Sequence, residues 1–440
     1  MKRRSIRLSC LLLVVLVMAS SLFCFSIGAA EETKLPAVEN AAAACLYDKT
    51  HNKMLVNENP DTVLNTSTSA KVMTGLIACQ MLAERLDETI TVTAEMLQGT
   101  SGYSMRLSVG ESIKIKDLLY GAICGSYNDA AYVLASVCAG SAQSFVSLMN
   151  ERARELGAES TAYTNPLGYP DNSAMVTTLS DTLKIALAAS DNELYMEIST
   201  AKKHDVAATN SSGARTVYNR NYLISSRSTQ AYYNEKCAGM NAGISGDAGG
   251  WSIVTLAHDD GADYICIVLG GKENEDGSAI YAYDTVNKLV NWACSTYNNR
   301  AVFEKDQILG VAEIEMTSLG KEKVRVAAAE SLSAYVSADN ASNLEYRLEY
   351  PDGALRAPLK AGDVIGKVKI YSGNEVVGEC DVYITEDCEV NAVMQVINTI
   401  GDYTKSRAFL ATIVCFAILL PIVLVSQSRK NSRRKGYRKY

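Results

Sequence analysis

The chain has 440 residues, more than a single ordinary hydrophobic core holds, so we expect two or three folded units. Its formal net charge is −7, but basic residues are concentrated at the ends: residues 1–30 carry four, residues 427–440 carry seven, and neither segment contains an acid. The part between the ends therefore carries a charge of about −18, which argues against nucleic acids and other polyanions as partners.

Both ends of the chain have the character of targeting segments. Residues 1–30 combine a basic start, an apolar run and small residues up to Ala30, the pattern of a secretory signal peptide; a retained N-terminal anchor is the alternative. Residues 408–426 form an apolar run long enough to cross a bilayer. Because positive charge stays on the cytoplasmic side, the basic tail of residues 427–440 predicts a single-pass protein of the cell membrane with its body outside and its tail in the cytoplasm.

Up to residue 298, helix and strand patterns are mixed. Paired apolar runs around polar turns predict two hairpins, at residues 41–59 and 251–271. Apolar residues at helical spacing predict four helices, at residues 70–86, 113–124, 130–140 and 144–157. Because the hairpins lie early and late with helices between them, we predict an α+β domain over residues 31–298 whose sheet joins both hairpins.

The pattern changes after residue 298. Short strand-like runs separated by turns such as Pro-Asp-Gly predict a small all-β module over residues 299–390, followed by a juxtamembrane segment, residues 391–407, with the pattern of an amphipathic helix. The cysteines have no zinc-site spacing, and Cys380 with Cys388 is the one pair that we suspect of forming a disulfide.

The first candidate for chemistry is the stretch NTSTSAK, residues 65–71. The three histidines of the chain give no sign of catalytic partners, so a histidine triad or a metal site is not expected, and lysine is the candidate base. A hydroxyl at the start of a helix and a lysine three residues later lie one turn apart on one face. If it is buried, Lys71 can be neutral and accept the hydroxyl proton, but a Ser/Thr-x-x-Lys sequence is weak evidence by itself.

The neighbouring segments are specific. The stretch LLYGAICGSYNDAAYVLASVCAGSAQSFVSLMNERARELG resembles the Ser-x-Asn region of the low-molecular-mass penicillin-binding proteins, which are serine-type D-alanyl-D-alanine carboxypeptidases. TAYTNPLGYPD is similar to the Asn-Pro-x-Gly segment of that family, and LRAPLKAGDVIGKVKI to its β-rich C-terminal module. The resemblance covers residues 40–425 in order. It implies a serine β-lactamase-like α+β domain, no metal or cofactor, and action on peptidoglycan stem peptides ending in D-Ala-D-Ala, with β-lactams as further ligands.

The resemblance also implies roles for individual residues. Thr68 occupies the position of the serine nucleophile, and Lys71 that of its base. Ser126 corresponds to the serine that relays a proton to the leaving amine, and Asn128 to the asparagine that holds the substrate amide. Ser67 and Ser69 are possible substitutes for the nucleophile: Ser67 can share the face of Lys71, whereas Ser69 points elsewhere on a helix.

The third motif departs most from the family. The segment CAGMNAGISGDAGGWSIVTLA aligns with the Lys-Thr-Gly strand, which binds the substrate carboxylate and backbone, but it reads Asn241, Ala242 and Gly243. The cation and the neighbouring hydroxyl are both replaced. Lys236 is five residues too early to take the place of the lysine without a rearrangement.

Two readings follow from these departures. One is a membrane-anchored carboxypeptidase that acts slowly through Thr68 and Lys71. The other is a non-catalytic relative that binds stem peptides or a partner in the cell envelope. Since electrostatic stabilisation is usually the largest catalytic contribution, we expect activity on the family substrate to be very low or nil. A β-lactamase fits less well with the C-terminal module and the anchor.

Overall fold

The computed structural model describes residues 35–65, 67–168, 175–224, 230–244, 250–275, 280–317, 321–337, 340 and 343–436. The predicted signal peptide, residues 1–30, lies outside these ranges. The chain folds as two units, and the division falls between residues 298 and 299.

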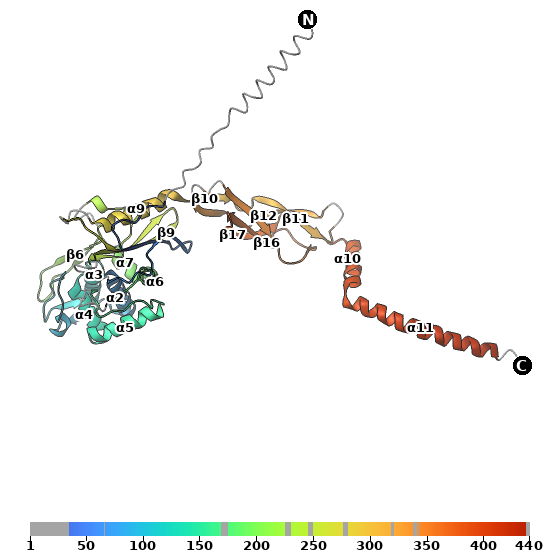
Figure 1. Ribbon diagram of the computed structural model, residues 1–440, viewed down its shortest axis with the longest axis horizontal. Helices are drawn as coiled ribbons and strands as arrows, with labels where there is room; N and C mark the ends of the chain where they lie inside the picture. The colour runs from blue at the N-terminus through green and yellow to red at the C-terminus, as the bar shows by residue number, and fades with distance from the viewer. Residues whose placement is uncertain are drawn as a thin grey trace, which may run out of the picture. The chain divides into compact units, whose positions relative to one another are not determined.

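The first unit contains a five-stranded antiparallel sheet with the strand order β2-β1-β9-β8-β7 (Figure 1). Its strands are β1 (Ala43–Asp48), β2 (Lys53–Glu58), β7 (Asn241–Ile244), β8 (Trp251–Asp259) and β9 (Ala262–Gly271). Both predicted hairpins are confirmed, and they join in one sheet because β1 pairs with β9. Strand β7, which carries the altered third motif, lies at the edge of this sheet.

Helices cover both faces of the sheet (Figure 1). On one face α9 packs against β8 and β9, and on the other α2 and α6 pack against the strands. The helices are α2 (Ser67–Leu82), α3 (Ile115–Ile123), α4 (Asn128–Ala139), α5 (Ala142–Glu155), α6 (Leu179–Ser190), α7 (Glu193–Thr200) and α9 (Tyr281–Thr296). The 3₁₀ turns are η1 (Ala83–Arg85), η2 (Glu95–Leu97) and η3 (Gln230–Tyr232), and the short strand pairs are β3 (Thr89–Thr91) with β4 (Ser112–Lys114) and β5 (Lys203–Val206) with β6 (Arg215–Tyr218).

Helix α2 is the central helix of the core. Apart from Met81 in its last turn, its apolar side chains are buried on every face of the helix, and they include Ala70, Val72, Met73, Leu76, Ala78 and Cys79. A helix buried on all sides belongs to the close-packed interior, where a displacement would open cavities. The first turn of α2, with Thr68 and Lys71, is therefore fixed relative to the sheet.

The second unit is an all-β module followed by two helices. Its main sheet has the order β14-β16-β17-β12-β11-β15, and β10 pairs separately with β13. The strands are β10 (Tyr297–Phe303), β11 (Ile308–Glu315), β12 (Lys323–Ala328), β13 (Leu332–Ser337), β14 (Leu344–Glu349), β15 (Leu355–Arg356), β16 (Val364–Ser372) and β17 (Glu375–Ile384). Alternate residues of these strands form the core, with Val326, Val368 and Val382 fully buried.

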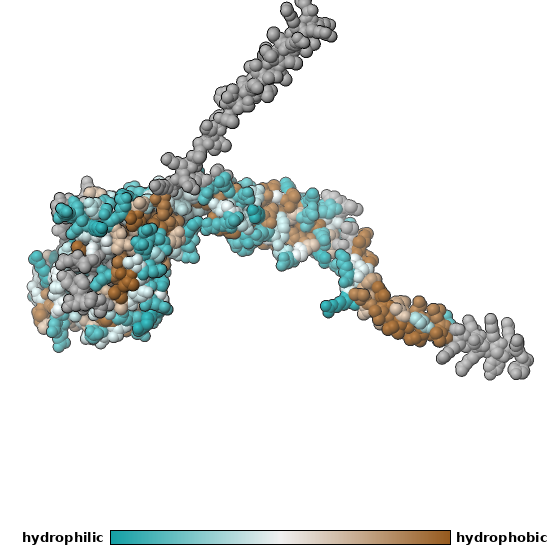
Figure 2. All heavy atoms as spheres, in the orientation of Figure 1, coloured by the Kyte–Doolittle hydropathy of each residue, from teal (hydrophilic) through white to brown (hydrophobic). Residues whose placement is uncertain are grey.

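The C-terminal helices are α10 (Ala392–Lys405) and α11 (Arg407–Gly436). Among the described residues, one helix is long and apolar enough to cross a membrane, over Arg407–Gln427, and none of this stretch is buried against protein. Figure 2 shows the mostly apolar surface of α11 up to Gln427. Pro421 lies inside this helix, as membrane helices tolerate.

Cys380 and Cys388 are free thiols, so the suspected disulfide is absent. Cys380 lies within β17, whereas Cys388 lies beyond the end of that strand, where its backbone pairs with Leu359.

Candidate active site

The first turn of α2 is bonded to the edge of the sheet through Thr68. The Thr68 side chain is fully buried, and its Oγ1 donates a hydrogen bond to the carbonyl oxygen of Ser252 at 3.0 Å. Ser252 lies on β8 opposite Gly243 of β7. The hydroxyl that aligns with the family nucleophile therefore joins the first and third motifs, and its proton points at a backbone carbonyl.

Replacing this hydroxyl by a methyl group tests its structural role. We expect Thr68→Val to lower the free energy of unfolding by about 1 kcal/mol, because the side chain keeps its shape while the Ser252 carbonyl loses a donor. Thr68→Ser is the matched control and should stay closer to the wild type. Urea denaturation of the full-length chain in detergent micelles measures both; equal stability of Thr68→Val and wild type would contradict the role.

Of the two alternative hydroxyls, Ser69 is engaged elsewhere. Its Oγ lies 2.8 Å from the hydroxyl oxygen of Tyr163, and both residues are buried in the core. This position agrees with the expectation that Ser69 points away from the face of Lys71. The side chain of Ser67 lies outside the described part of the structure.

Lys71 contacts the second motif. Its Nζ donates to both the backbone oxygen and the Oγ of Ser126, each at 2.9 Å. Burial lowers the pKa of Lys71 to about 7, and the positive charge of Arg220 lowers it further in the same direction. A large share of this lysine is therefore neutral at neutral pH, as a base must be. Within the described residues, however, no hydrogen bond joins Lys71 to Thr68.

The pKa of Lys71 has a consequence for stability. The pKa falls from 10.5 in an exposed lysine to about 7 in the folded protein, so between these values the unfolded chain binds more protons than the folded one. Stability therefore rises with pH across that window, and Lys71 should contribute about 2 kcal/mol between pH 7 and pH 9. Urea denaturation at both pH values should show that the free energy of unfolding rises less with pH in Lys71→Met than in wild type. An equal rise in the two proteins would contradict the lowered pKa.

The Ser-x-Asn segment forms the turn between α3 and α4. Ser126 has a φ of 53°, which is rare for a residue other than glycine and is often found at functional sites. The Asn128 backbone N–H donates to the Tyr103 carbonyl at 2.7 Å, and its Nδ2 donates to the Ser101 carbonyl at 2.6 Å. The Asn128 side chain is buried, but its Oδ1 has no hydrogen-bond partner. An acceptor is thus left for an incoming donor.

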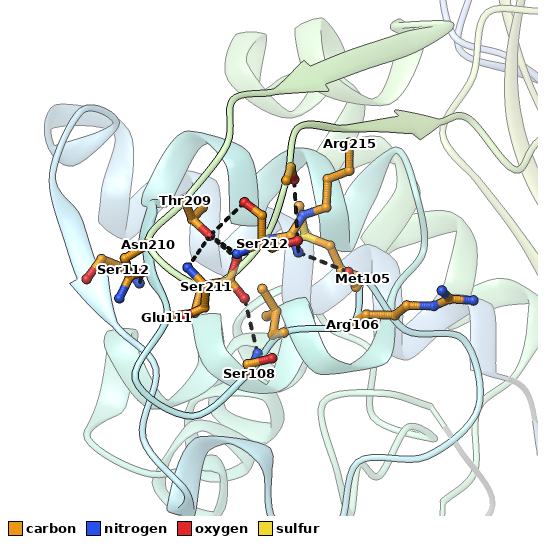
Figure 3. Close-up of polar contacts among 12 residues, drawn as sticks. Met105, Arg106, Ser108, Glu111, Ser112, Thr209, Asn210, Ser211, Ser212 and Arg215 are labelled. Carbon is orange, nitrogen blue, oxygen red and sulfur yellow. Dashed lines mark hydrogen bonds and ion pairs between the residues drawn. The ribbon is translucent and has the colours of Figure 1, made fainter.

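The loop before the Ser-x-Asn segment is held by two buried carboxylates. Asp129 accepts hydrogen bonds from Ser104 and from the backbone of Met105 and Leu107. Glu111 forms an ion pair with Arg215 at 2.6 Å (Figure 3). These contacts fix the loop that positions Asn128.

The third motif presents a neutral edge strand. Asn241 is buried, and its Oδ1 has no partner. Ala242, also buried, has no hydroxyl to offer at the next position. The nearby cation considered from the sequence, Lys236, forms an ion pair with Asp259 and is not directed to the motif. No described group of three or more His, Cys, Asp or Glu side chains has the arrangement of a metal site.

The structure thus brings Lys71 and Ser126 into contact and links Thr68 to the strand pair of the third motif. Arg220 and Ser252 were missed in the sequence. Ser252 acts through its backbone, which carries no sequence signal, and Arg220 lies in a segment, residues 219–222, without a recognisable pattern.

Both units of the chain are similar to known proteins. Residues 30–273 match the peptidase S11 family, described as D-alanyl-D-alanine carboxypeptidase, and residues 297–390 match the C-terminal domain of penicillin-binding protein 5. The D-alanyl-D-alanine carboxypeptidase DacF of Bacillus subtilis is 24% identical over 375 residues, 83% of this chain and 91% of the relative. DacC of Escherichia coli is 26% identical over 379 residues, 84% of this chain and 89% of the relative.

Solved structures show the same fold. Penicillin-binding protein 5 from Haemophilus influenzae superposes with a TM-score of 0.57 at 22% identity, covering 81% of this chain and 99% of that structure. The expected fold, a penicillin-binding-protein-like α+β domain followed by an all-β domain, is confirmed. Since the family model matches more than half of the chain, this protein belongs to the peptidase S11 family of D-alanyl-D-alanine carboxypeptidases, enzymes of peptidoglycan metabolism.

Proposed function

We propose that this chain is a membrane-anchored member of the family that binds stem peptides ending in D-Ala-D-Ala, and that its acyl-transfer activity is weak or lost. The observation that carries the proposal is the hydrogen bond from Thr68 to Ser252. A nucleophilic hydroxyl must transfer its proton to a base. The Thr68 hydroxyl instead donates a hydrogen bond to a backbone carbonyl, and Lys71 donates to Ser126. Rotation of Thr68 toward Lys71 would break a buried bond and is restricted by the β-branched side chain.

The altered third motif supports the same proposal. With Asn241 at the position of the family lysine, β7 offers no positive charge to the substrate carboxylate. The loss of one group that stabilises transition-state charge typically costs about 10² to 10³ in rate. Binding is less affected than chemistry, because the buried amide oxygens of Asn128 and Asn241 are free to accept hydrogen bonds from a peptide.

The second candidate is a slow carboxypeptidase. It is favoured by the pKa of about 7 at Lys71 and by the contact of Lys71 with Ser126, since both belong to a working proton relay. In this interpretation the Thr68 hydroxyl breaks its hydrogen bond with the Ser252 carbonyl only when substrate is bound.

The anchor is part of the proposal. The apolar stretch Arg407–Gln427 is followed by basic residues up to the C-terminus, so we propose that the tail faces the cytoplasm and the folded units face the cell wall. In this orientation the candidate site lies on the side of the membrane where stem peptides occur.

Calorimetry with the full-length chain in detergent micelles tests the function. A short peptide ending in D-Ala-D-Ala should bind saturably, and the matched peptide ending in L-Ala-L-Ala should not. Release of D-alanine, measured in the same samples, should stay at the level of Lys71→Ala. Equal binding of the two peptides would refute a stem-peptide binder, whereas repeated turnover that Lys71→Ala abolishes would establish the slow enzyme.

A further inference from the structure

We propose that a cavity between α9 and residues 39–40, just before β1, binds a neutral saccharide of the kind that forms the glycan strands of peptidoglycan. The cavity has a volume of about 440 Å³, which lies in the range of small-molecule sites. It is separate from the candidate active site, because α9 covers the face of the sheet opposite to α2 (Figure 1). The proposal goes beyond the proposed function and does not depend on it.

One wall of the cavity is a stripe of polar residues along α9. The wall includes Tyr281, Asp284, Lys288 and Asn291, whose spacing of three or four residues places them on one face of the helix. The residues of the opposite face are apolar and buried, and that face packs against β8 and β9. The helix therefore turns its polar stripe away from the core.

The other wall is the backbone of residues 39–40, which is bonded on two sides. The Lys272 N–H, just after β9, donates to the Asn40 carbonyl at 2.8 Å. The Thr285 hydroxyl of α9 donates to the Glu39 carbonyl at 3.4 Å. Because this wall is tied both to the sheet and to the helix, the cavity is part of the folded unit.

A buried amide orients the polar stripe. Asn234 is 8% exposed, and its Nδ2 donates to the Oδ1 of Asn287 at 2.9 Å and to the Oδ1 of Asn291 at 3.1 Å. Asn287 is bonded at both ends, since its Nδ2 donates to the Tyr232 carbonyl. The oxygen of Asn291 is likewise engaged, so its Nδ2 is the group that remains to donate to a ligand in the cavity.

The charged groups of the lining are not paired with one another. Within the part of the chain that the structure describes, the charged groups of Glu39, Asp284 and Lys288 form no ion pair or hydrogen bond. Asp284 and Lys288 have the i,i+4 spacing at which a helix allows such a pair. Two acceptors and one strong donor are therefore available to a ligand, in addition to the amide of Asn291.

This mixture of groups favours an uncharged, polyhydroxylated ligand. An anion would meet the carboxylates of Glu39 and Asp284, and a cation would meet Lys288. A hydroxyl group both donates and accepts hydrogen bonds, so a sugar satisfies the donors and the acceptors at once. The partly exposed ring of Tyr281 offers an aromatic surface to the C–H groups of a sugar ring. Peptidoglycan contains such a ligand, because its stem peptides are carried on strands of N-acetylated amino sugars.

Calorimetry with triacetylchitotriose, an uncharged oligomer of N-acetylglucosamine, tests the proposal. The full-length chain is kept in micelles of a detergent without a sugar headgroup, so that the detergent does not compete. The wild type should bind the trisaccharide saturably, and Asp284→Ala and Asn291→Ala should each weaken binding by about three- to tenfold. Ser295→Ala, an exposed position of α9 outside the cavity, is the matched control and should bind as the wild type does. If either cavity variant fails to fold, Lys288→Met at an exposed position should show the same loss.

A competition experiment separates the cavity from the candidate active site. A saturating peptide ending in D-Ala-D-Ala should leave the affinity for the trisaccharide unchanged, and displacement by this peptide would place the sugar in the active site and overturn the proposal. Absence of saccharide binding by the wild type, or unchanged binding in all the cavity variants, would also overturn it, while peptide binding and the proposed function would stand. Tighter binding of glycylglycine than of the trisaccharide would assign the cavity to zwitterionic ligands and refute the saccharide.

Discussion

Thr68→Ser combined with Asn241→Lys and Ala242→Thr is expected to raise the rate of acylation by a fluorescent penicillin by at least about a hundredfold. The serine removes the methyl group that restricts rotation toward Lys71. The lysine restores a cation on β7 for the carboxylate of the ligand, and the threonine restores the neighbouring hydroxyl. Labelling of full-length protein in membranes, followed over time, measures the rate.

The partial variants separate the two altered motifs. Thr68→Ser alone should raise the acylation rate little, because the cation is still absent from β7. Asn241→Lys with Ala242→Thr should also raise this rate little, because the nucleophile is still held by its β-branched side chain. Full acylation by Thr68→Ser alone would show that the third motif does not limit the reaction. A triple variant that folds but does not label would show that the geometry around Lys71 itself has changed.

Breaking the ion pair between Glu111 and Arg215 is expected to have the largest effect on stability. Glu111 is fully buried and the Arg215 side chain is 17% exposed, so Glu111→Ala leaves a mostly buried charge without its partner. Removal of one member of such a pair typically costs about 3–5 kcal/mol. Glu111 also accepts hydrogen bonds from Thr209 and from the Ser108 backbone, which join two distant segments (Figure 3).

Urea denaturation of the full-length chain measures this loss, and an exposed pair gives the control. Glu88→Ala breaks the exposed surface pair with Arg85 and should cost much less stability than Glu111→Ala. Replacing both buried partners, Glu111→Leu with Arg215→Met, should recover much of the stability. A loss in Glu111→Ala as small as that in Glu88→Ala would contradict the role of the pair. Because Arg215 also donates to the Met105 carbonyl, peptide binding at Asn128 should weaken in Glu111→Ala.

The elements predicted from the sequence are those with a strong local signal. Apolar runs around a polar turn predicted the β1–β2 and β8–β9 hairpins, and helical spacing predicted α2 to α5. Helix α9 was not predicted, although its buried residues Ala282, Val286, Leu289 and Ala293 lie at helical spacing, and it is needed to cover one face of the sheet. Strand β11 was missed because its exposed face carries the apolar residues Ile308 and Val311, which obscure the alternation of apolar and polar positions.

The site was predictable only in part. The tetrapeptide from Thr68 to Lys71 and the Ser-x-Asn segment are local patterns, and the resemblance assigned their roles. The partner of the Thr68 hydroxyl is a backbone carbonyl 184 residues away, which no local pattern reveals. The position of Arg220 likewise depends on backbone bonds to Cys124 and, through Asn221, to Gly239, and these exist only in the folded chain.

The state of the Thr68 hydroxyl is tested most directly by the mass of the intact protein after incubation with saturating benzylpenicillin. The proton of Thr68 is directed to Ser252 and Lys71 is bonded to Ser126, so the wild-type mass should remain unshifted over a time in which the triple variant is fully acylated. A stoichiometric adduct on the wild-type chain, mapped by peptide sequencing to Thr68 and absent from Thr68→Ala, would contradict the account.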